Sequence, residues 1–172
     1  KTNPSELTQE QLKQLYYGSK FVKIEYTIGN YNSESGTFWK PAQKKISKSK
    51  AEKIVNEAES KYLKNPLNKS LLDDMINIYS ALNENQKIDL CIKQKDLIIQ
   101  TIEKSGDGKS EETAICVLTP GEVLQQLDIL IKSGPRAQFD QKMKQLSDGS
   151  ILTIYRIGDR EKFVKLVGGY FF

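Results

Sequence analysis

The residue types that perform most acid–base and nucleophilic chemistry are scarce in this chain. Its 172 residues include two cysteines and no histidine. Histidine is the usual general base, the usual partner of a serine or cysteine nucleophile and a common metal ligand. Cys91 and Cys116 are far apart in the sequence and have no other soft ligand nearby, which makes a poor zinc site. From these residue types we predict no catalytic residue, no metal site and no cofactor.

One stretch is similar to a nucleotide-binding motif, the sequence Gly-Asp-Gly-Lys-Ser over residues 106–110. The phosphate-loop motif requires its first glycine at position 103, where this chain has Glu103. Such a loop also follows a strand and opens a helix, so that amides at the helix N-terminus contact the phosphates. Here a predicted helix precedes the loop and a predicted strand follows it. Nucleotide binding is therefore not predicted.

The acidic residues leave one catalytic alternative open, a carboxylate-dependent hydrolase acting on glycans. Two carboxylates in one cleft can perform acid–base catalysis. The chain has 22 acids, and their sequence positions do not say which of them share a cleft. Asp73 and Asp74 are adjacent, but neighbouring side chains diverge on a helix, and the positive N-terminal end of that helix explains them.

Aromatic residues are concentrated between residues 16 and 39, in a segment interrupted by glycine, asparagine and serine. Clustered aromatic rings can form a platform for a glycan, a peptide or a partner protein. The alternative is that the rings pack this irregular segment onto the core. The candidate ligand or partner surface comprises Tyr16, Tyr17, Tyr26, Tyr31 and Trp39.

The charge of the chain indicates no nucleic-acid partner. There are 26 basic and 22 acidic residues, and the formal net charge is +4. This small excess is mostly offset along the chain, so it makes no basic stripe. The lysines between residues 40 and 53 are explained by a solvated linker and the start of a helix. No stretch approaches the roughly 20 apolar residues that span a bilayer, so no transmembrane segment is predicted.

The cysteines and the first residue bear on the cellular compartment. Cys91 and Cys116 lie among apolar residues, which suits free thiols; a bridge between them is the alternative in an oxidising compartment. The chain begins at Lys1 rather than at methionine, as it would after removal of an N-terminal targeting peptide. We expect an exported protein of the periplasm or the cell surface.

The elements that position these residues begin with helices. Ser5 can cap a first helix that Gly18 ends. A stripe of apolar residues from Ala51, with helical spacing, predicts a second helix. Short polar connections make the next helices antiparallel neighbours, as a tetratricopeptide-like helix pair plus one. The predicted helices cover residues 5–17, 68–82 and 86–103, and the second runs from about residue 51 until Asn65 and Pro66 end it. The fourth is expected to bury Ile88, Cys91, Ile92, Ile99 and Ile102.

The spacing of apolar residues changes to that of strands after residue 110. A short β-branched run over residues 113–118 predicts a strand. A helix then begins at Pro120 and stops at residues 133–135. Further strands are predicted over residues 139–144, 151–157 and 163–167. Helices first and strands later predict an α+β fold, in which an N-terminal antiparallel helical layer packs on a small, mainly antiparallel C-terminal sheet with one helix.

The length of the chain fits one domain. We predict a single domain over residues 1–172 in three parts. These parts are a helix and aromatic loop over residues 1–42, a helical layer over residues 43–105 and a β-α-β-β segment over residues 110–172.

Three short sequences carry a resemblance to a known family. They are Leu-Tyr-Tyr-Gly over residues 15–18, Asn-Pro-Leu-Asn over residues 65–68, and Gly-Asp-Gly-Lys over residues 106–109, which leads into Thr-Ala-Ile at 113–115. With this layout the chain resembles an uncharacterised family of secreted or envelope proteins from gut anaerobic bacteria, known only as a domain of unknown function. The resemblance extends over most of the chain. It implies export and no known activity.

Together these observations predict a non-catalytic binding or protein-interaction module of the bacterial cell envelope. Its expected partner is a protein, a peptide or a glycan. Two alternatives are the glycan hydrolase described above and a structural subunit whose aromatic segment is an oligomer contact.

Overall fold

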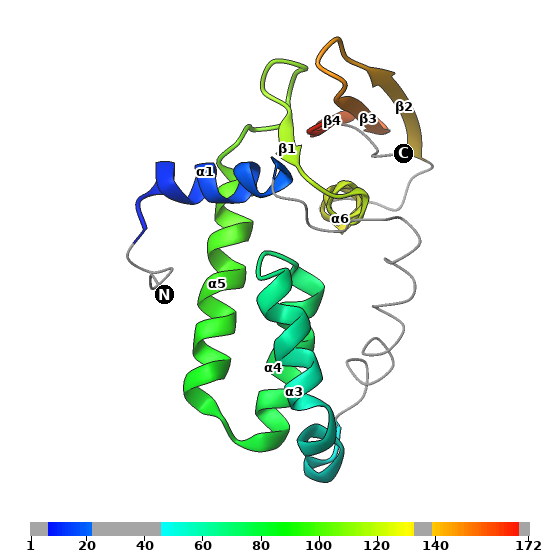
Figure 1. The fold of residues 1–172 in the computed structure, drawn as a ribbon. Helices are drawn as coiled ribbons and strands as arrows, with labels where there is room; N and C mark the ends of the chain where they lie inside the picture. Colours follow the sequence, from blue (N-terminus) through cyan, green and yellow to red (C-terminus); the bar gives the residue numbers. More distant parts are fainter. Residues whose placement is uncertain (1–6, 22–45, 133–138, 169–172) are drawn as a thin grey trace. The chain divides into compact units, whose positions relative to one another are not determined.

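The computed structural model describes residues 7–21, 46–132 and 139–168 of the chain (Figure 1). Over these residues it has five α-helices, four of them before the first strand, and a four-stranded sheet in the C-terminal part. The predicted α+β class is confirmed. The chain divides into two compact units, Lys1–Ile99 and Gln100–Phe172, and each is described by itself. The prediction of a single domain over residues 1–172 stays a prediction.

The first helix, α1, spans Gln9–Gly18 and begins with a capping box. The Thr8 hydroxyl accepts a hydrogen bond from the Gln11 N–H, and the Gln11 side chain accepts one from the Thr8 N–H. These bonds satisfy N–H groups that lack partners within the first turn. The helix therefore begins later than predicted, and Ser5, the predicted cap, lies outside the described residues. A 3-10 turn over Ser19–Phe21, labelled η2, follows α1.

Three further helices lie close to their predicted bounds. They are α3 (Lys48–Lys64), α4 (Lys69–Leu82) and α5 (Asn85–Glu103), and the last residues of α5 belong to the second unit. Asn68 caps α4, because its side-chain oxygen accepts hydrogen bonds from the N–H groups of Ser70 and Leu71 at 2.9 and 3.2 Å. Asn83 ends α4 in the left-handed conformation, with φ of 60°, which asparagine tolerates better than most residues.

The core of the first unit forms where α3 packs on α4. Its most deeply buried side chains on these two helices are Ala51, Ala58, Leu72, Met75 and Ile78. The burial predicted for α5 is only partly confirmed. Cys91 and Ile102 are buried, but Ile88 and Ile99 are only half-buried. The prediction for Ile92 is wrong, because it is 41% exposed and Ile98 is buried instead. Apolar residues occur on more than one side of α5, so the spacing alone does not select the buried side.

The second unit is built on a mixed sheet. Its strands are β1 (Ile115–Val117), β2 (Phe139–Gln145), β3 (Ile151–Ile157) and β4 (Arg160–Leu166). Their spatial order is β1-β4-β3-β2. The last three strands form an antiparallel meander, and β1 pairs with β4 in parallel. The sheet is therefore mainly antiparallel, and β1 and β2 are its two edges (Figure 1).

The helix α6 (Pro120–Lys132) covers one face of this sheet, where it contacts β4, β3 and β1. The carboxylate of Glu122 accepts hydrogen bonds from the N–H groups of Leu118 and Thr119 at 3.0 and 3.1 Å, which fixes the first turn. The Arg160 guanidinium donates to the Leu130 carbonyl of α6 at 3.2 Å, so Arg160 marks the face of the sheet that α6 covers. We call this the α6 face.

Candidate functional site

The structure places two of the five aromatic residues that were predicted to form a binding surface. Tyr16 is buried, with 3% of its surface exposed. Tyr17 is half-buried and meets the Tyr16 ring edge-on, with the ring centroids 4.9 Å apart. Tyr26, Tyr31 and Trp39 lie outside the described residues. The predicted aromatic surface therefore stays a prediction, and Tyr16 contributes to packing.

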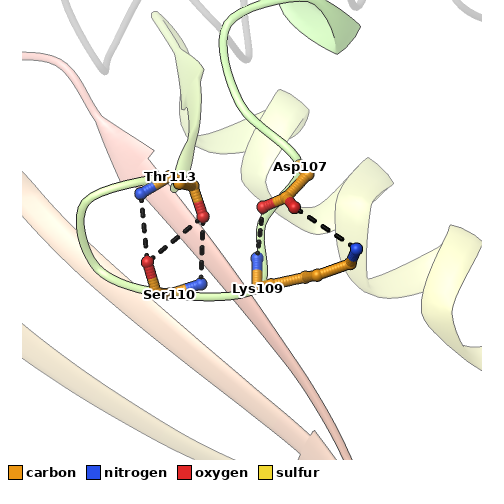
Figure 2. Close-up of polar contacts among 4 residues, drawn as sticks. All are labelled: Asp107, Lys109, Ser110 and Thr113. Atoms are coloured by element: carbon orange, nitrogen blue, oxygen red, sulfur yellow. Dashed lines mark hydrogen bonds and ion pairs between the residues drawn. The ribbon is translucent and has the colours of Figure 1, made fainter.

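The loop between α5 and β1 gathers several polar side chains, and Figure 2 shows four of them. The Asp107 carboxylate accepts a hydrogen bond from the Lys109 N–H at 3.0 Å and forms an ion pair with the Lys109 ammonium at 3.4 Å. Ser110 and Thr113 bind each other reciprocally, since each backbone N–H donates to the other hydroxyl, at 3.2 and 3.3 Å. These four residues thus bind one another in two pairs, whereas Glu111 of the same loop pairs with Lys144 at 3.0 Å.

Two glycines let this loop lie against the sheet. A Cβ on Gly106 would lie 2.3 Å from the Thr113 carbonyl oxygen, closer than any side chain tolerates. Gly108 has a φ of +69°, and its carbonyl accepts a hydrogen bond from the Phe163 N–H of β4 at 2.9 Å. The helix α5 precedes the loop and β1 follows it, as predicted. The loop is therefore a structural connection to β4 and has no helix N-terminus to hold a phosphate.

The acidic groups of the loop are held in their charged form. A hydrogen bond from Thr113 and another from the Lys109 N–H keep the pKa of Asp107 below its usual range. A hydrogen bond from Ser110 likewise lowers the pKa of Glu112. Both carboxylates are ionised at neutral pH, so neither is suited to donate a proton as a general acid.

Among the carboxyl groups of the described residues, the pKa of Asp74, on α4, is raised the most. Burial, with a smaller contribution from the neighbouring Asp73 charge, raises its pKa from 3.8 to about 6. Asp74 is 9% exposed, whereas Asp73 is more exposed and forms an ion pair with Lys95 of α5. A raised pKa of this kind occurs at catalytic sites, but acid–base hydrolysis needs a second carboxylate across a cleft. Asp73 is adjacent on the same helix and does not supply that arrangement.

Two tyrosine hydroxyls connect the helices of the first unit. The Tyr79 hydroxyl of α4 donates to the Glu59 carboxylate of α3 at 2.8 Å, and Lys87 of α5 binds the same carboxylate at 3.1 Å. The Tyr62 hydroxyl of α3 donates to the Gln94 side chain of α5 at 2.6 Å. Burial raises the pKa of both tyrosines. These phenols remain neutral and hold α3, α4 and α5 together.

Two absences hold for the described part of the chain. It contains no group of three or more histidine, cysteine, aspartate or glutamate side chains placed to hold a metal ion. In the same residues, no helix combines the length and the apolar character that crossing a membrane requires. Cys91 is buried and Cys116 half-buried, and no disulfide joins them.

In the second unit, β2 forms an exposed edge of the sheet. All seven residues of β2 are exposed. Their neighbours on one side are the residues of β3, paired from Phe139 with Ile157 to Gln145 with Ile151. No described strand pairs on the other side. The helix α6 packs on the other three strands, so β2 projects beyond the part of the sheet that α6 covers.

The backbone groups at this open edge belong to the odd-numbered residues of β2. The Leu146 N–H donates to the Ser150 carbonyl at 2.8 Å, one step beyond the last β2–β3 pair. Hydrogen-bonded pairs alternate along an antiparallel ladder, so the even-numbered residues of β2 face β3. The odd-numbered residues, Phe139, Gln141, Met143 and Gln145, present their N–H and C=O groups outward. Among described residues, the only bond to these outward groups is from the Gln141 N–H to the Asp140 carboxylate, at 2.8 Å.

The side chains of β2 differ between its two faces. Phe139 and Met143 lie on the α6 face, because they pair with Ile157 and Thr153, and Ile157 pairs with Arg160. They are 47% and 52% exposed. The opposite face carries the charged side chains of the even-numbered residues, Asp140, Lys142 and Lys144. The edge thus offers main-chain hydrogen bonds, two apolar contacts and a pattern of charges in one strand, and we take β2 as the candidate functional site.

Comparison with known proteins identifies the family. A family model described as "Domain of unknown function (DUF4919)" matches residues 1–145. The chain belongs to this family. The predicted resemblance to a family of unknown function is therefore confirmed. The DUF4919 match includes the loop of Figure 2 and β2, and it ends at the last residue of β2. No curated protein and no solved structure matches the chain.

Sequence reasoning predicted the strand in this DUF4919 chain but assigned it no function. The signal was present in the alternation of apolar Phe139 and Met143 with charged Asp140, Lys142 and Lys144. Such alternation predicts a strand with one apolar face. It does not say that the strand lies at an edge, because the order of strands in a sheet depends on long-range pairing.

Proposed function

We propose that this protein is a non-catalytic protein-interaction module that binds an extended polypeptide along β2. The observation that supports the proposal is that β2 is an edge strand, exposed along its whole length, with outward backbone groups that no described strand pairs. A polypeptide that adds a strand to such an edge gains main-chain hydrogen bonds, and alternate side chains determine its specificity. An edge strand is a template for pairing unless it is blocked.

The side chains of β2 define the sequence that such a partner would need. Apolar residues of the partner would contact Phe139 and Met143 on the α6 face. On the other face, an acidic residue would lie opposite Lys142 and a basic residue opposite Asp140. The Lys144 ammonium already pairs with the Glu111 carboxylate at 3.0 Å. Oppositely charged pairs across neighbouring strands stabilise a sheet, and like charges destabilise it. The preferred partner is therefore a strand with alternating apolar and charged residues.

We place this function in the bacterial cell envelope, as an exported protein of a gut anaerobic bacterium. This part of the proposal comes from the family resemblance of the sequence. Fractionation of the native cells, with detection by an antibody against this chain, tests it. We expect the protein in the periplasmic or surface fraction; its confinement to the cytoplasm would contradict this location.

The interaction itself is tested with displayed peptides. A library of random peptides is selected on the immobilised wild-type protein, and the enriched peptides are titrated against two variants of one position. Gln141→Ala keeps the outward N–H, and Gln141→Pro removes it. Proline is tolerated at an edge where the N–H faces solvent, so both variants keep the ladder to β3. Circular dichroism checks that both variants are folded.

We expect enriched peptides to bind Gln141→Ala within a few-fold of the wild type and Gln141→Pro about ten-fold more weakly or worse, because one or more main-chain hydrogen bonds are lost. If no peptide is enriched, or if Gln141→Pro binds as well as Gln141→Ala, β2 is not the binding site.

A further inference from the structure

We infer that the strand added at this edge is β2 of a second copy of the chain, antiparallel to the first and related to it by a two-fold axis at Gln141. This inference rests on the proposed function, since it names the partner of the same site. It would join two four-stranded sheets into one continuous sheet. The argument comes from the residues that each possible register places opposite one another.

Symmetry limits the registers to a few. Two antiparallel copies of one strand are related by an axis perpendicular to the sheet, so residues directly opposite each other point to the same face. Side chains alternate between faces with a period of two. Each residue therefore lies opposite a residue of the same parity, and the residue at the axis lies opposite its own copy. We name each register by that central residue. Three central residues leave at least five of the seven residues of β2 paired: Gln141, Lys142 and Met143.

One of these three registers avoids like charges. With the axis at Gln141, Asp140 of each copy lies opposite Lys142 of the other. The pairing is symmetric, so two opposite-charge pairs form. With the axis at Lys142, Lys142 faces itself, and Asp140 faces Lys144, whose ammonium already pairs with Glu111 at 3.0 Å. With the axis at Met143, Lys142 faces Lys144 twice. Like charges directly opposite destabilise strand pairing, so the charges of β2 select the register centred on Gln141.

The same register also pairs the exposed apolar residues. Phe139 of each copy lies opposite Met143 of the other, on the α6 face. A thioether sulfur next to an aromatic ring makes a favourable contact. Both side chains are about half exposed, so the contact removes apolar surface from water. The two faces of the strand, which follow different chemistry, therefore favour the same register.

The outward backbone groups fit this register as well. Phe139, Gln141 and Met143 are odd-numbered, and their N–H and C=O groups point away from β3. Gln141 would exchange both of its backbone hydrogen bonds with Gln141 of the second copy. In the single chain its N–H binds the Asp140 carboxylate. On pairing, the N–H gains a carbonyl acceptor and the carboxylate is released to bind Lys142.

This exchange makes the association weak and dependent on concentration. A pairing of five residues is small compared with the roughly 1,600 Å² of a standard stable interface. The bond from Gln141 to Asp140 must also be broken first. We expect a monomer at low micromolar concentration and a growing fraction of dimer as the concentration rises.

The experiment is sedimentation equilibrium of the full chain from about 1 μM to about 1 mM, a range that covers weak association. The variants are Asp140→Lys, Lys142→Asp and the double variant with both changes. Each single change places like charges opposite each other at both symmetric positions. The double change restores opposite charges in the reverse order. All of these positions are exposed, and circular dichroism checks the fold.

We expect the wild type to dimerise, each single variant to dimerise about ten-fold more weakly or worse, and the double variant to recover to within a few-fold of the wild type. Lys144→Gln is the matched control, because Lys144 faces no charged residue in this register. In the register centred on Lys142 it would face Asp140, so a loss of dimer in Lys144→Gln overturns the register. If the single substitutions weakened the dimer only by damaging the fold, the double variant would not recover its dimerisation.

A monomer throughout the concentration range overturns the inference, as does a double variant that associates no better than the single ones. These results are separate from the test of the proposed function. If the wild type stays monomeric but binds displayed peptides in a manner that Gln141→Pro abolishes, the edge binds a different polypeptide and only the self-pairing is wrong. If neither association occurs, both proposals are wrong.

Discussion

The carboxyl group of Asp74 gives the sharpest test of the electrostatics of the first unit. Burial raises its pKa from 3.8 to about 6, so the folded chain binds this proton more tightly than the unfolded chain does. The neutral acid therefore contributes stability below pH 3.8, and this contribution is lost as the pH rises through about 6. Above that pH, folding must bury a charge. The substitution Asp74→Asn removes this charge with little change in shape.

The size of the effect follows from the shift. A rise from 3.8 to about 6 corresponds to roughly 3 kcal/mol at ~1.36 kcal/mol per pKa unit. Solvent screening at a partly solvated carboxyl reduces this to about 1–2 kcal/mol. We expect Asp74→Asn to be more stable than the wild type by about that amount at pH 7.5, and the difference to disappear below about pH 4.

The assay is urea unfolding followed by circular dichroism, at several pH values between about 4 and 8. Asp73→Asn is the matched control. Asp73 is half-exposed and pairs with Lys95, so its removal should change stability by no more than about 1 kcal/mol. If Asp74→Asn is less stable than the wild type at pH 7.5, or if the difference does not depend on pH, the carboxylate has a favourable partner and the assigned cause of the pKa shift is wrong.

Three further predictions concern other parts of the chain. Gly106→Ala should lower stability by about 2 kcal/mol or more, because its Cβ would lie 2.3 Å from the Thr113 carbonyl oxygen. Thermal unfolding measures this change. The control is Gly149→Ala, which should lower stability by only about 1 kcal/mol, because Gly149 has open space around it but a φ of +79°. Under native conditions a thiol reagent should label Cys116 before Cys91, because Cys91 is 3% exposed and burial raises its pKa; mass spectrometry of the digested protein identifies the first site, and earlier labelling of Cys91 would refute the assignment. Hydrogen bonds from Lys165 and Ser150 lower the pKa of Asp148 from 3.8 to about 2, so Asp148→Asn should lower the melting temperature at pH 7. The difference in melting temperature should shrink as the pH falls from 3.8 through about 2. A difference that does not depend on pH would mean that the carboxylate charge is not the cause.

Local periodicity was sufficient to predict most of the elements. The helix predicted over residues 68–82 starts one residue later, after its cap Asn68, and the strand predicted over residues 151–157 has these bounds in β3. Both follow from short-range preferences, namely capping for the helix and alternation for the strand. The choice between Ile92 and Ile98 as a buried residue could not be predicted in this way, since it depends on which side of α5 meets other parts of the protein.

The burial of Asp74 was not predicted from the sequence, because its charge favoured an exposed position. Leu71, Asp74, Met75 and Ile78 follow the spacing of one helix face, which places Asp74 among buried positions. An aspartate at such a position was explained instead by the positive end of the helix, because charged side chains are seldom buried. The candidate site at β2 was beyond local reasoning for another reason. Its edge position depends on β4 pairing with β1 in parallel, and such long-range pairing leaves no trace in the spacing of residues 139–145.

The strand order affects how fragments of this protein should be designed. A fragment cut at the family boundary, residue 145, would retain β1 and β2 and lose β3 and β4. In the order β1-β4-β3-β2 the two retained strands are not neighbours, so each would lose its only described pairing partner. The family boundary is thus not a folding boundary, and an expression clone that ends there would yield a second unit without a sheet.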